Sequence, residues 1–252
     1  MPTATALRPT WYVDARHPDV RAFARVATSG AATPAATAAA LFTAVRDHIR
    51  YDPYALDLRP EAMRASAVLA SDMRQRLLDG ALRCVASIGL GRLTVEDVAE
   101  ASAVSRQTVY RYFGSRDALI EAVILREEQV LLARLTAAVQ RHEQALPALQ
   151  AALEEALVAA AGHPLLRRLL DREPEALLPY LLANDSPVLS AALPVVESLL
   201  ARFAPHLTAR ELGAVADMAS RLLISYVVSP SEEPHEIVAG RVAELIAASL
   251  KI

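Results

Sequence analysis

Residues 104–119 have the sequence VSRQTVYRYFGSRDAL, and the fold predicted for the chain depends on this stretch. It holds three arginines and three aromatic rings, although aromatic residues make up 5% of the whole chain. Ser105 can cap a short helix that ends at Gly114, because serine is a favoured N-cap and glycine a favoured helix stop. Ser115 can then cap a long helix. The stretch therefore predicts two helices joined by a single sharp break.

The residues before this stretch complete a recognisable motif. Apolar residues at helical spacing predict a helix over 72–88. Thr94, with Asp97 three positions later, has the pattern of a capping box at the start of a helix over 94–101. A tight joint then leads to the short helix 105–113. Two short helices joined by a sharp turn predict a helix-turn-helix, whose second helix enters the major groove of DNA.

The second helix has two chemically different faces. Val109 and Phe113 lie four residues apart and are expected to pack inward. Arg106, Gln107 and Tyr110 point away from that side. Arginine can bond guanine and glutamine can bond adenine in the major groove, so these three are the candidate base-contacting residues. The alternative is an ordinary surface helix with incidental arginines.

Charge supports a local DNA-binding surface, not a general one. The chain has a net charge of −3, yet residues 101–116 hold three arginines and no acid. A solvated helix face usually mixes both signs, so the lack of carboxylates favours contact with phosphates.

The segment LTVEDVAEASAVSRQTVYRYFGSRDALIEAV (93–123) resembles the DNA-binding domain of the TetR family of transcriptional regulators. The resemblance implies base contacts from Arg106, Gln107 and Tyr110. It also implies that the DNA backbone is contacted by Thr94, Thr108, Tyr112 and Arg116. The family usually has glycine where this chain has Ala103. If that position needs a positive φ, alanine costs about 1 kcal/mol.

The rest of the chain predicts an all-α protein. Helical patterns follow to the C-terminus, separated by short breaks containing proline, asparagine or serine, and no alternating strand pattern is present. We expect a helical extension over 1–70, a TetR-type DNA-binding domain over 71–121, and a larger helical ligand-sensing and dimerisation domain over 122–252.

Two functions are expected of the C-terminal helices. The apolar stripes within 187–228 are the favoured candidates for a homodimer surface, with RVAELIAASL (241–250) a third possibility; the alternative is that these stripes only fill their own core. Residues 164–189 combine a leucine-rich wall with Arg172 and Tyr180, which fits an apolar pocket with polar anchors, or an ordinary core. By resemblance, the protein would be a repressor that binds a palindromic double-stranded DNA operator and is released by a small apolar or amphipathic effector.

Residues 1–70 resemble the opening helices of bacterial transglutaminase-like domains, but the segment that would carry the catalytic cysteine is missing. Cys84, the single cysteine, lies on an apolar helical stripe and is expected to be a core residue. We therefore expect no catalytic residue, metal or cofactor. The alternative is a helical scaffold, or an inactive remnant of a thiol enzyme fused to a helix-turn-helix. No signal peptide or membrane span is recognised, which favours a cytoplasmic protein.

Overall fold

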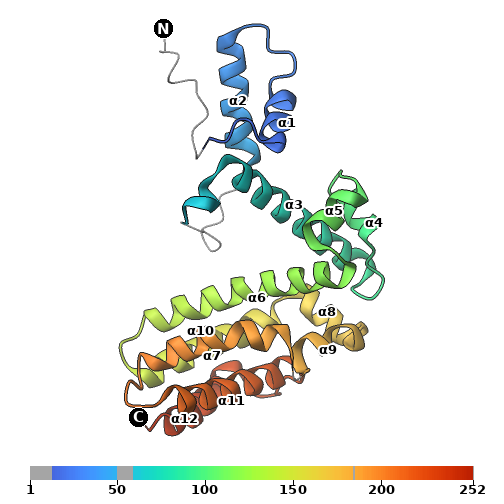
Figure 1. The fold of residues 1–252 in the computed structure, drawn as a ribbon. Coiled ribbons are helices and arrows are strands. Elements are labelled where there is room, and N and C mark those ends of the chain that lie inside the picture. Colours follow the sequence, from blue (N-terminus) through green and yellow to red (C-terminus); the bar gives the residue numbers. More distant parts are fainter. Residues whose placement is uncertain (1–12, 50–58, 184, 252) are drawn as a thin grey trace. The chain divides into compact units, whose positions relative to one another are not determined.

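The computed structural model describes residues 13–49, 59–183 and 185–251, and every regular element in these ranges is a helix (Figure 1). The expected all-α fold is confirmed. In the described part of the chain, no helix is both long enough and apolar enough to cross a bilayer.

The chain divides into two compact units, residues 1–79 and 80–252. The first contains α1 (Pro18–Ala27), α2 (Pro34–His48), a 3-10 turn (Pro60–Met63) and the beginning of α3 (Ala65–Ile88). Residues 50–58, between α2 and this turn, lie outside the described residues.

Helix α3 differs from the expected organisation. The predicted helix began near residue 72, but α3 begins at Ala65 and continues without interruption to Ile88. The physical reason is that residues 61–79 contain neither proline nor glycine. No linker therefore separates residue 70 from residue 71.

The helix-turn-helix elements form as their capping residues predict. Helix α4 (Val95–Ala101) begins with a complete capping box between Thr94 and Asp97. Helix α5 (Arg106–Phe113) is capped by Ser105, whose hydroxyl accepts a hydrogen bond from the Thr108 N–H at 3.2 Å. Helix α6 (Arg116–Gln140) is capped by the Ser115 hydroxyl in the same way.

The turn between α4 and α5 contains a strained residue. Ala103 has a φ of +53°, in the left-handed region. This is the backbone conformation for which the glycine usual in the family at this position is suited. Two contacts fix this turn against α3. A Cβ on Gly80 would lie 2.2 Å from the Ser102 hydroxyl, and the Arg83 guanidinium donates to the Ala101 carbonyl at 3.0 Å.

The remaining helices form a bundle alongside α6. They are α7 (Ala145–Ala161), α8 (Pro164–Arg172), α9 (Pro174–Leu182), α10 (Pro187–Ala201), α11 (Ala209–Val228) and α12 (His235–Ser249). Helix α7 packs against α6 and α12, and α10 packs against α6 and α11. Helices α8 and α9 lie at the same end of α6 as α4 and α5 (Figure 1).

Candidate nucleic-acid interface and effector cavity

Helix α5 presents the face that the sequence predicted. Val109 is 1% exposed and anchors the helix from behind. Arg106, Gln107 and Tyr110 are all exposed, with 49% of the Tyr110 surface accessible. The three candidate base-contacting side chains are therefore free of covering protein and lie on one short helix.

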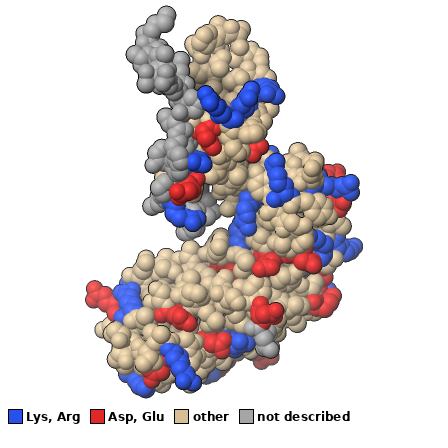
Figure 2. All heavy atoms as spheres, in the orientation of Figure 1, with Lys and Arg blue, Asp and Glu red and all other residues tan. Residues whose placement is uncertain are grey.

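The charge around this face is less one-sided than the sequence indicated. Arg106 forms an ion pair with Glu96 of α4, with 2.9 Å between the guanidinium nitrogen and the carboxylate oxygen. The hydrogen bond from Arg106 lowers the pKa of Glu96 below its usual value. Figure 2 accordingly shows acidic atoms beside the arginines where α4 and α5 lie. Residues 101–116 lack acids, but the fold brings one from α4.

Three of the four candidate phosphate contacts also hold the motif together or are partly covered. Thr94 is exposed, and its hydroxyl takes part in the capping box. The Thr108 hydroxyl lies 3.0 Å from that of Ser105. Tyr112 is half-buried, and the Arg111 guanidinium lies 5.4 Å from the centre of its ring.

Arg116, the fourth candidate, has a structural role that sequence reasoning missed. Its guanidinium donates to the Leu90 and Gly91 carbonyls, both at 2.9 Å, and to the Leu93 carbonyl. The side chain nevertheless remains 38% exposed. Arg116 therefore fixes the loop that precedes α4, and no sequence pattern marks those three carbonyls as its partners.

A large apolar cavity lies within the second unit. Its volume is about 250 Å³, and it is bounded by residues of α3 and of α6 to α11. Leucines of the expected segment 164–189 contribute to the wall: Leu165, Leu166, Leu169, Leu177, Leu181 and Leu189. The cavity exceeds the roughly 150 Å³ engineered cavity that binds benzene, so it has room for a small ligand.

The two polar anchors expected for this pocket lie elsewhere. Neither Arg172 nor Tyr180 is among the residues that line the cavity. Arg172 is exposed, and Tyr180 is half-buried, with burial raising the pKa of its phenol. The polar residues of the cavity wall come instead from α6, α11 and the start of α8.

Two of these polar lining residues are Glu127 and His163. The His163 Nδ1 accepts the Leu166 N–H at 3.1 Å, so the ring proton lies on Nε2 and faces the Glu127 carboxylate at 3.4 Å. This hydrogen bond lowers the pKa of Glu127. The next residue, Glu128, has the opposite environment, because burial raises its pKa to about 8. Sequence reasoning missed Glu128, although a carboxylate in line with Ile124 and Leu135 on α6 was a visible signal.

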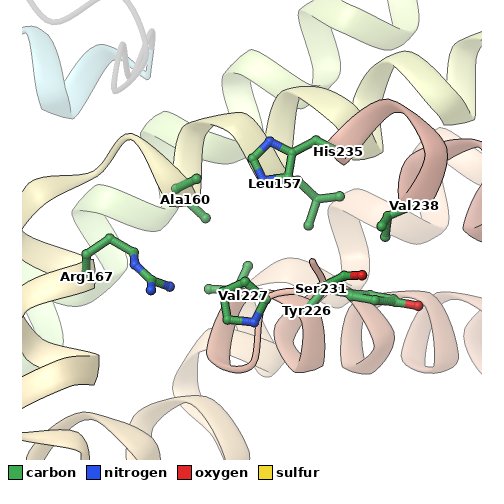
Figure 3. Close-up of a pocket in the computed structure, with 10 residues that line it drawn as sticks. Leu157, Ala160, Arg167, Tyr226, Val227, Ser231, His235 and Val238 are labelled. Atoms are coloured by element: carbon green, nitrogen blue, oxygen red, sulfur yellow. The ribbon is translucent and has the colours of Figure 1, made fainter. Parts of the chain in front are cut away.

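A second pocket lies between α7, α8, α11 and α12 and is much smaller (Figure 3). The labelled side chains of Arg167 and His235 border it, as do Leu157 and Tyr226. Its volume of about 20 Å³ suits a water molecule but not an organic effector.

The cavity is physically connected to the DNA-binding elements. Leu82, Val85 and Leu90 of α3 and its following loop form part of its wall. Close by, the Glu173 carboxylate accepts the Gly91 N–H at 2.9 Å, and the Arg168 guanidinium donates to the Ser87 carbonyl at 3.2 Å. Helix α8 thus contacts the end of α3, and Glu173, the residue between α8 and α9, contacts the loop that precedes α4.

Cys84 lies in the core, as expected. It is 8% exposed, its thiol approaches the Asp97 carbonyl at 3.5 Å, and burial raises its pKa. A buried thiol with a raised pKa is a poor nucleophile, because the reactive form is the thiolate.

Comparison with known proteins identifies the family. Residues 77–123 match the family model described as bacterial regulatory proteins, tetR family. Residues 144–248 match the model described as bacterial tetracyclin repressor, C-terminal domain. This chain is a TetR-family regulator. It is a ligand-responsive, DNA-binding transcriptional regulator and not an enzyme.

Individual TetR-family relatives agree with this assignment. The HTH-type transcriptional regulator AlkX of Mycobacterium tuberculosis is 28% identical over 179 residues, which are 66% of this chain and 80% of the relative. The crystal structure of the TetR family repressor AlkX from Dietzia sp. matches with a TM-score of 0.59 and 27% identity, covering 71% of this chain and 95% of that one. The structure of the R. erythropolis transcriptional repressor QsdR shares the fold at 19% identity and a TM-score of 0.54, and the match covers 71% of this chain and 95% of that one.

Neither family model includes residues 1–76. The resemblance of the N-terminal segment to a transglutaminase-like domain therefore stays a hypothesis.

Proposed function

We propose that this TetR-family regulator is a repressor that binds a palindromic DNA operator as a homodimer and is released by a small apolar effector. The observation that carries the proposal is the exposed α5 face in the same compact unit as an apolar cavity of about 250 Å³. The first feature suits DNA, and the second suits a ligand.

In the proposed complex, α5 enters the major groove. Arg106 donates to the O6 and N7 atoms of a guanine, and Gln107 pairs with the edge of an adenine. Tyr110 contacts a thymine methyl group or the sugar-phosphate backbone. In the free protein Arg106 is ion-paired with Glu96 at 2.9 Å, and this ion pair breaks when the guanidinium binds a base.

Phosphate contacts are proposed for Thr94, Thr108, Tyr112 and Arg116. Each lies on the α4–α5 motif or at the beginning of α6. Thr94 and Arg116 are near helix N-termini, where free N–H groups attract anions. Because Arg116 also holds three loop carbonyls, its removal would disturb the motif as well as any phosphate contact.

We assign the dimer surface to α10 and α11. Both helices carry apolar side chains that are only half-buried in the single chain, including Leu193, Leu199, Met218 and Leu222. A two-fold pair would cover these side chains and place two copies of α5 one helical turn of DNA, about 34 Å, or a multiple of it apart.

The effector is proposed to be aliphatic. The wall of the cavity is dominated by leucine, valine and isoleucine. The Dietzia relative is described as implicated in the biodegradation of n-alkanes, which agrees with an aliphatic class of ligand for this chain. Because α3 and α8 both contribute to the wall, a ligand that moves them would also shift the loop before α4.

We further propose that residues 1–70 form an extension that carries no catalytic role, that residues 71–121 bind DNA, and that residues 122–252 sense the ligand. A protein of this kind acts on chromosomal DNA, so we propose a cytoplasmic location.

Selection of bound duplexes from a random DNA pool tests this function. The full chain should enrich a sequence with two inverted half-sites, and adding an aliphatic ligand should release the selected DNA. Enrichment of no sequence, or of a single site without symmetry, would contradict the proposal.

A further inference from the structure

Two polar side chains in the apolar wall of the cavity have no hydrogen-bond partner within the described part of the chain. Both carboxyl oxygens of Glu128 are buried and unbonded, and so is the hydroxyl oxygen of Ser220. Glu128 lies on α6 in line with Ile124 and Leu135, and Ser220 lies on α11 in line with Leu223, so both face the cavity.

Such groups are costly in a folded protein. A buried polar atom without a partner loses its hydrogen bonds to water and gains none in return. Ser220 is 8% exposed, so bulk water does not compensate for this loss. A ligand that supplies hydrogen bonds at these positions would recover it on binding.

The charges around the cavity restrict the kind of ligand. Arg134, the one cation among the described lining residues, is already paired with Glu155 of α7 at 2.6 Å. His163 is bonded to Glu127 at 3.4 Å. An anionic head group would therefore be buried beside two carboxyl groups without a free cation to neutralise it.

We propose that the effector is an aliphatic molecule with a neutral hydroxyl or amide head group, which hydrogen-bonds to Glu128, with Ser220 as a second polar contact. This inference rests on the proposed effector function of the cavity and specifies its ligand class. The hydrocarbon part of the molecule lies along the leucine-rich wall.

The protonation state of Glu128 fits a neutral head group. Burial raises its pKa to about 8, so its carboxyl group is mostly protonated at pH 7. In this form it offers one donor and at least one acceptor, as Ser220 does. A hydroxyl or a primary amide, which also both donates and accepts, complements either group.

Binding of three matched eight-carbon probes to the full chain tests the inference. The affinity for octan-1-ol is measured by calorimetry at pH 7, and octane and octanoate are titrated in competition with it. We expect octan-1-ol to bind about tenfold more tightly than either competitor, because each of them leaves Glu128 without a good partner or buries a charge.

Variants of the same chain assign the preference to Glu128. Glu128→Leu should reduce the affinity for octan-1-ol to that for octane, and Ser220→Ala should reduce it by about threefold. Glu128→Gln keeps a neutral group that donates and accepts, so it should retain the preference, and it serves if the leucine variant does not fold. Glu121→Leu, an exposed position two turns earlier on α6, is the matched control and should leave the preference intact.

The possible failures are distinguishable. If octane or octanoate binds as tightly as octan-1-ol, or if the preference survives in Glu128→Leu, the inferred ligand class is wrong while the cavity remains an aliphatic effector site. If none of the three probes binds, the effector role of the cavity fails, and this inference fails with it.

Discussion

Ala103, in the turn between α4 and α5, adopts a backbone conformation that alanine disfavours, with a φ of +53°. Replacing it by glycine removes the clash between the Cβ and the backbone. We expect Ala103→Gly to raise the free energy of unfolding by about 1 kcal/mol, which corresponds to a rise in Tm of roughly 2–4 °C. Ala137→Gly, at an exposed helical position of α6, is the control and should lower the Tm. A fall in Tm for Ala103→Gly would show that the turn does not need this conformation.

The raised pKa of Glu128 should make the stability of the fold depend on pH. Its pKa is raised from 4.5 to about 8, so the folded state keeps a proton that the unfolded chain releases. Stability from this group is therefore complete below pH 4.5 and is lost as the pH rises towards 8. The carboxyl oxygens are buried but the residue as a whole is only half-buried, so we expect Glu128→Gln to be more stable than the native chain by about 2 kcal/mol at pH 8 and nearly equal at pH 5. Chemical denaturation at both pH values measures the difference.

The other titratable and charged groups of the cavity wall are Glu127, Arg134 and His163. Glu127 is the control for this measurement, because its pKa is shifted in the opposite direction to that of Glu128. The hydrogen bond from His163 lowers the pKa of Glu127, so its contribution is present above pH 4.5 and lost in acid. Glu127→Gln should therefore be less stable than the native chain at pH 8. Equal behaviour of the two variants would contradict the assignment of opposite environments to these neighbouring carboxyl groups.

At the scale of single elements, the contact between Glu173 and the loop before α4 can be tested without a ligand. The Glu173 carboxylate accepts the Gly91 N–H at 2.9 Å and lies against Gly89, where a Cβ would clash with it. We expect Glu173→Ala to speed amide hydrogen exchange in residues 89–93 by about tenfold, because a charge-assisted hydrogen bond is lost. Glu175→Ala, exposed in the first turn of α9, is the matched control. If both variants exchange alike, α9 does not restrain this loop.

Helix boundaries were predictable from the sequence because capping is local. Thr94, Ser105 and Ser115 each bond an N–H group three residues ahead, so the signal and its effect lie within one turn. The predicted start of α3, near residue 72, was too late, because no proline or glycine between residues 65 and 72 marks a break and the helix extends back to Ala65.

The candidate site was predictable only in part. The outward face of α5 followed from helical periodicity. The partners of Arg106 and Arg116 did not, because Glu96 and the carbonyls of residues 90–93 reach them through the turn of the motif, which sequence spacing does not describe. The cavity anchors depend on which faces of α6 and α11 meet, and this is a property of packing between distant segments.

At the scale of the whole molecule, the N-terminal extension can be separated from DNA binding. Because α3 begins at Ala65, deletion of residues 1–64 leaves the helix whole, and we expect the shortened chain to bind the selected DNA within about threefold of the full chain. Deletion of residues 1–79 removes the buried Leu77 and Leu78 and should abolish binding. Anisotropy titrations with labelled duplex measure both. Loss of binding in the shorter deletion would make residues 1–64 part of the DNA-binding function.

Helix α5 is proposed to contact base edges in the major groove through Arg106 and Gln107. Methylation interference on the selected duplex tests this most directly, because methylated guanine is blocked at N7 in the major groove and methylated adenine at N3 in the minor groove. We expect interference at guanine N7 in two inverted clusters about 10 base pairs apart or a multiple of this, with the signal lost in Arg106→Ala. Interference confined to adenine N3, or an unchanged guanine pattern in Arg106→Ala, would contradict the account.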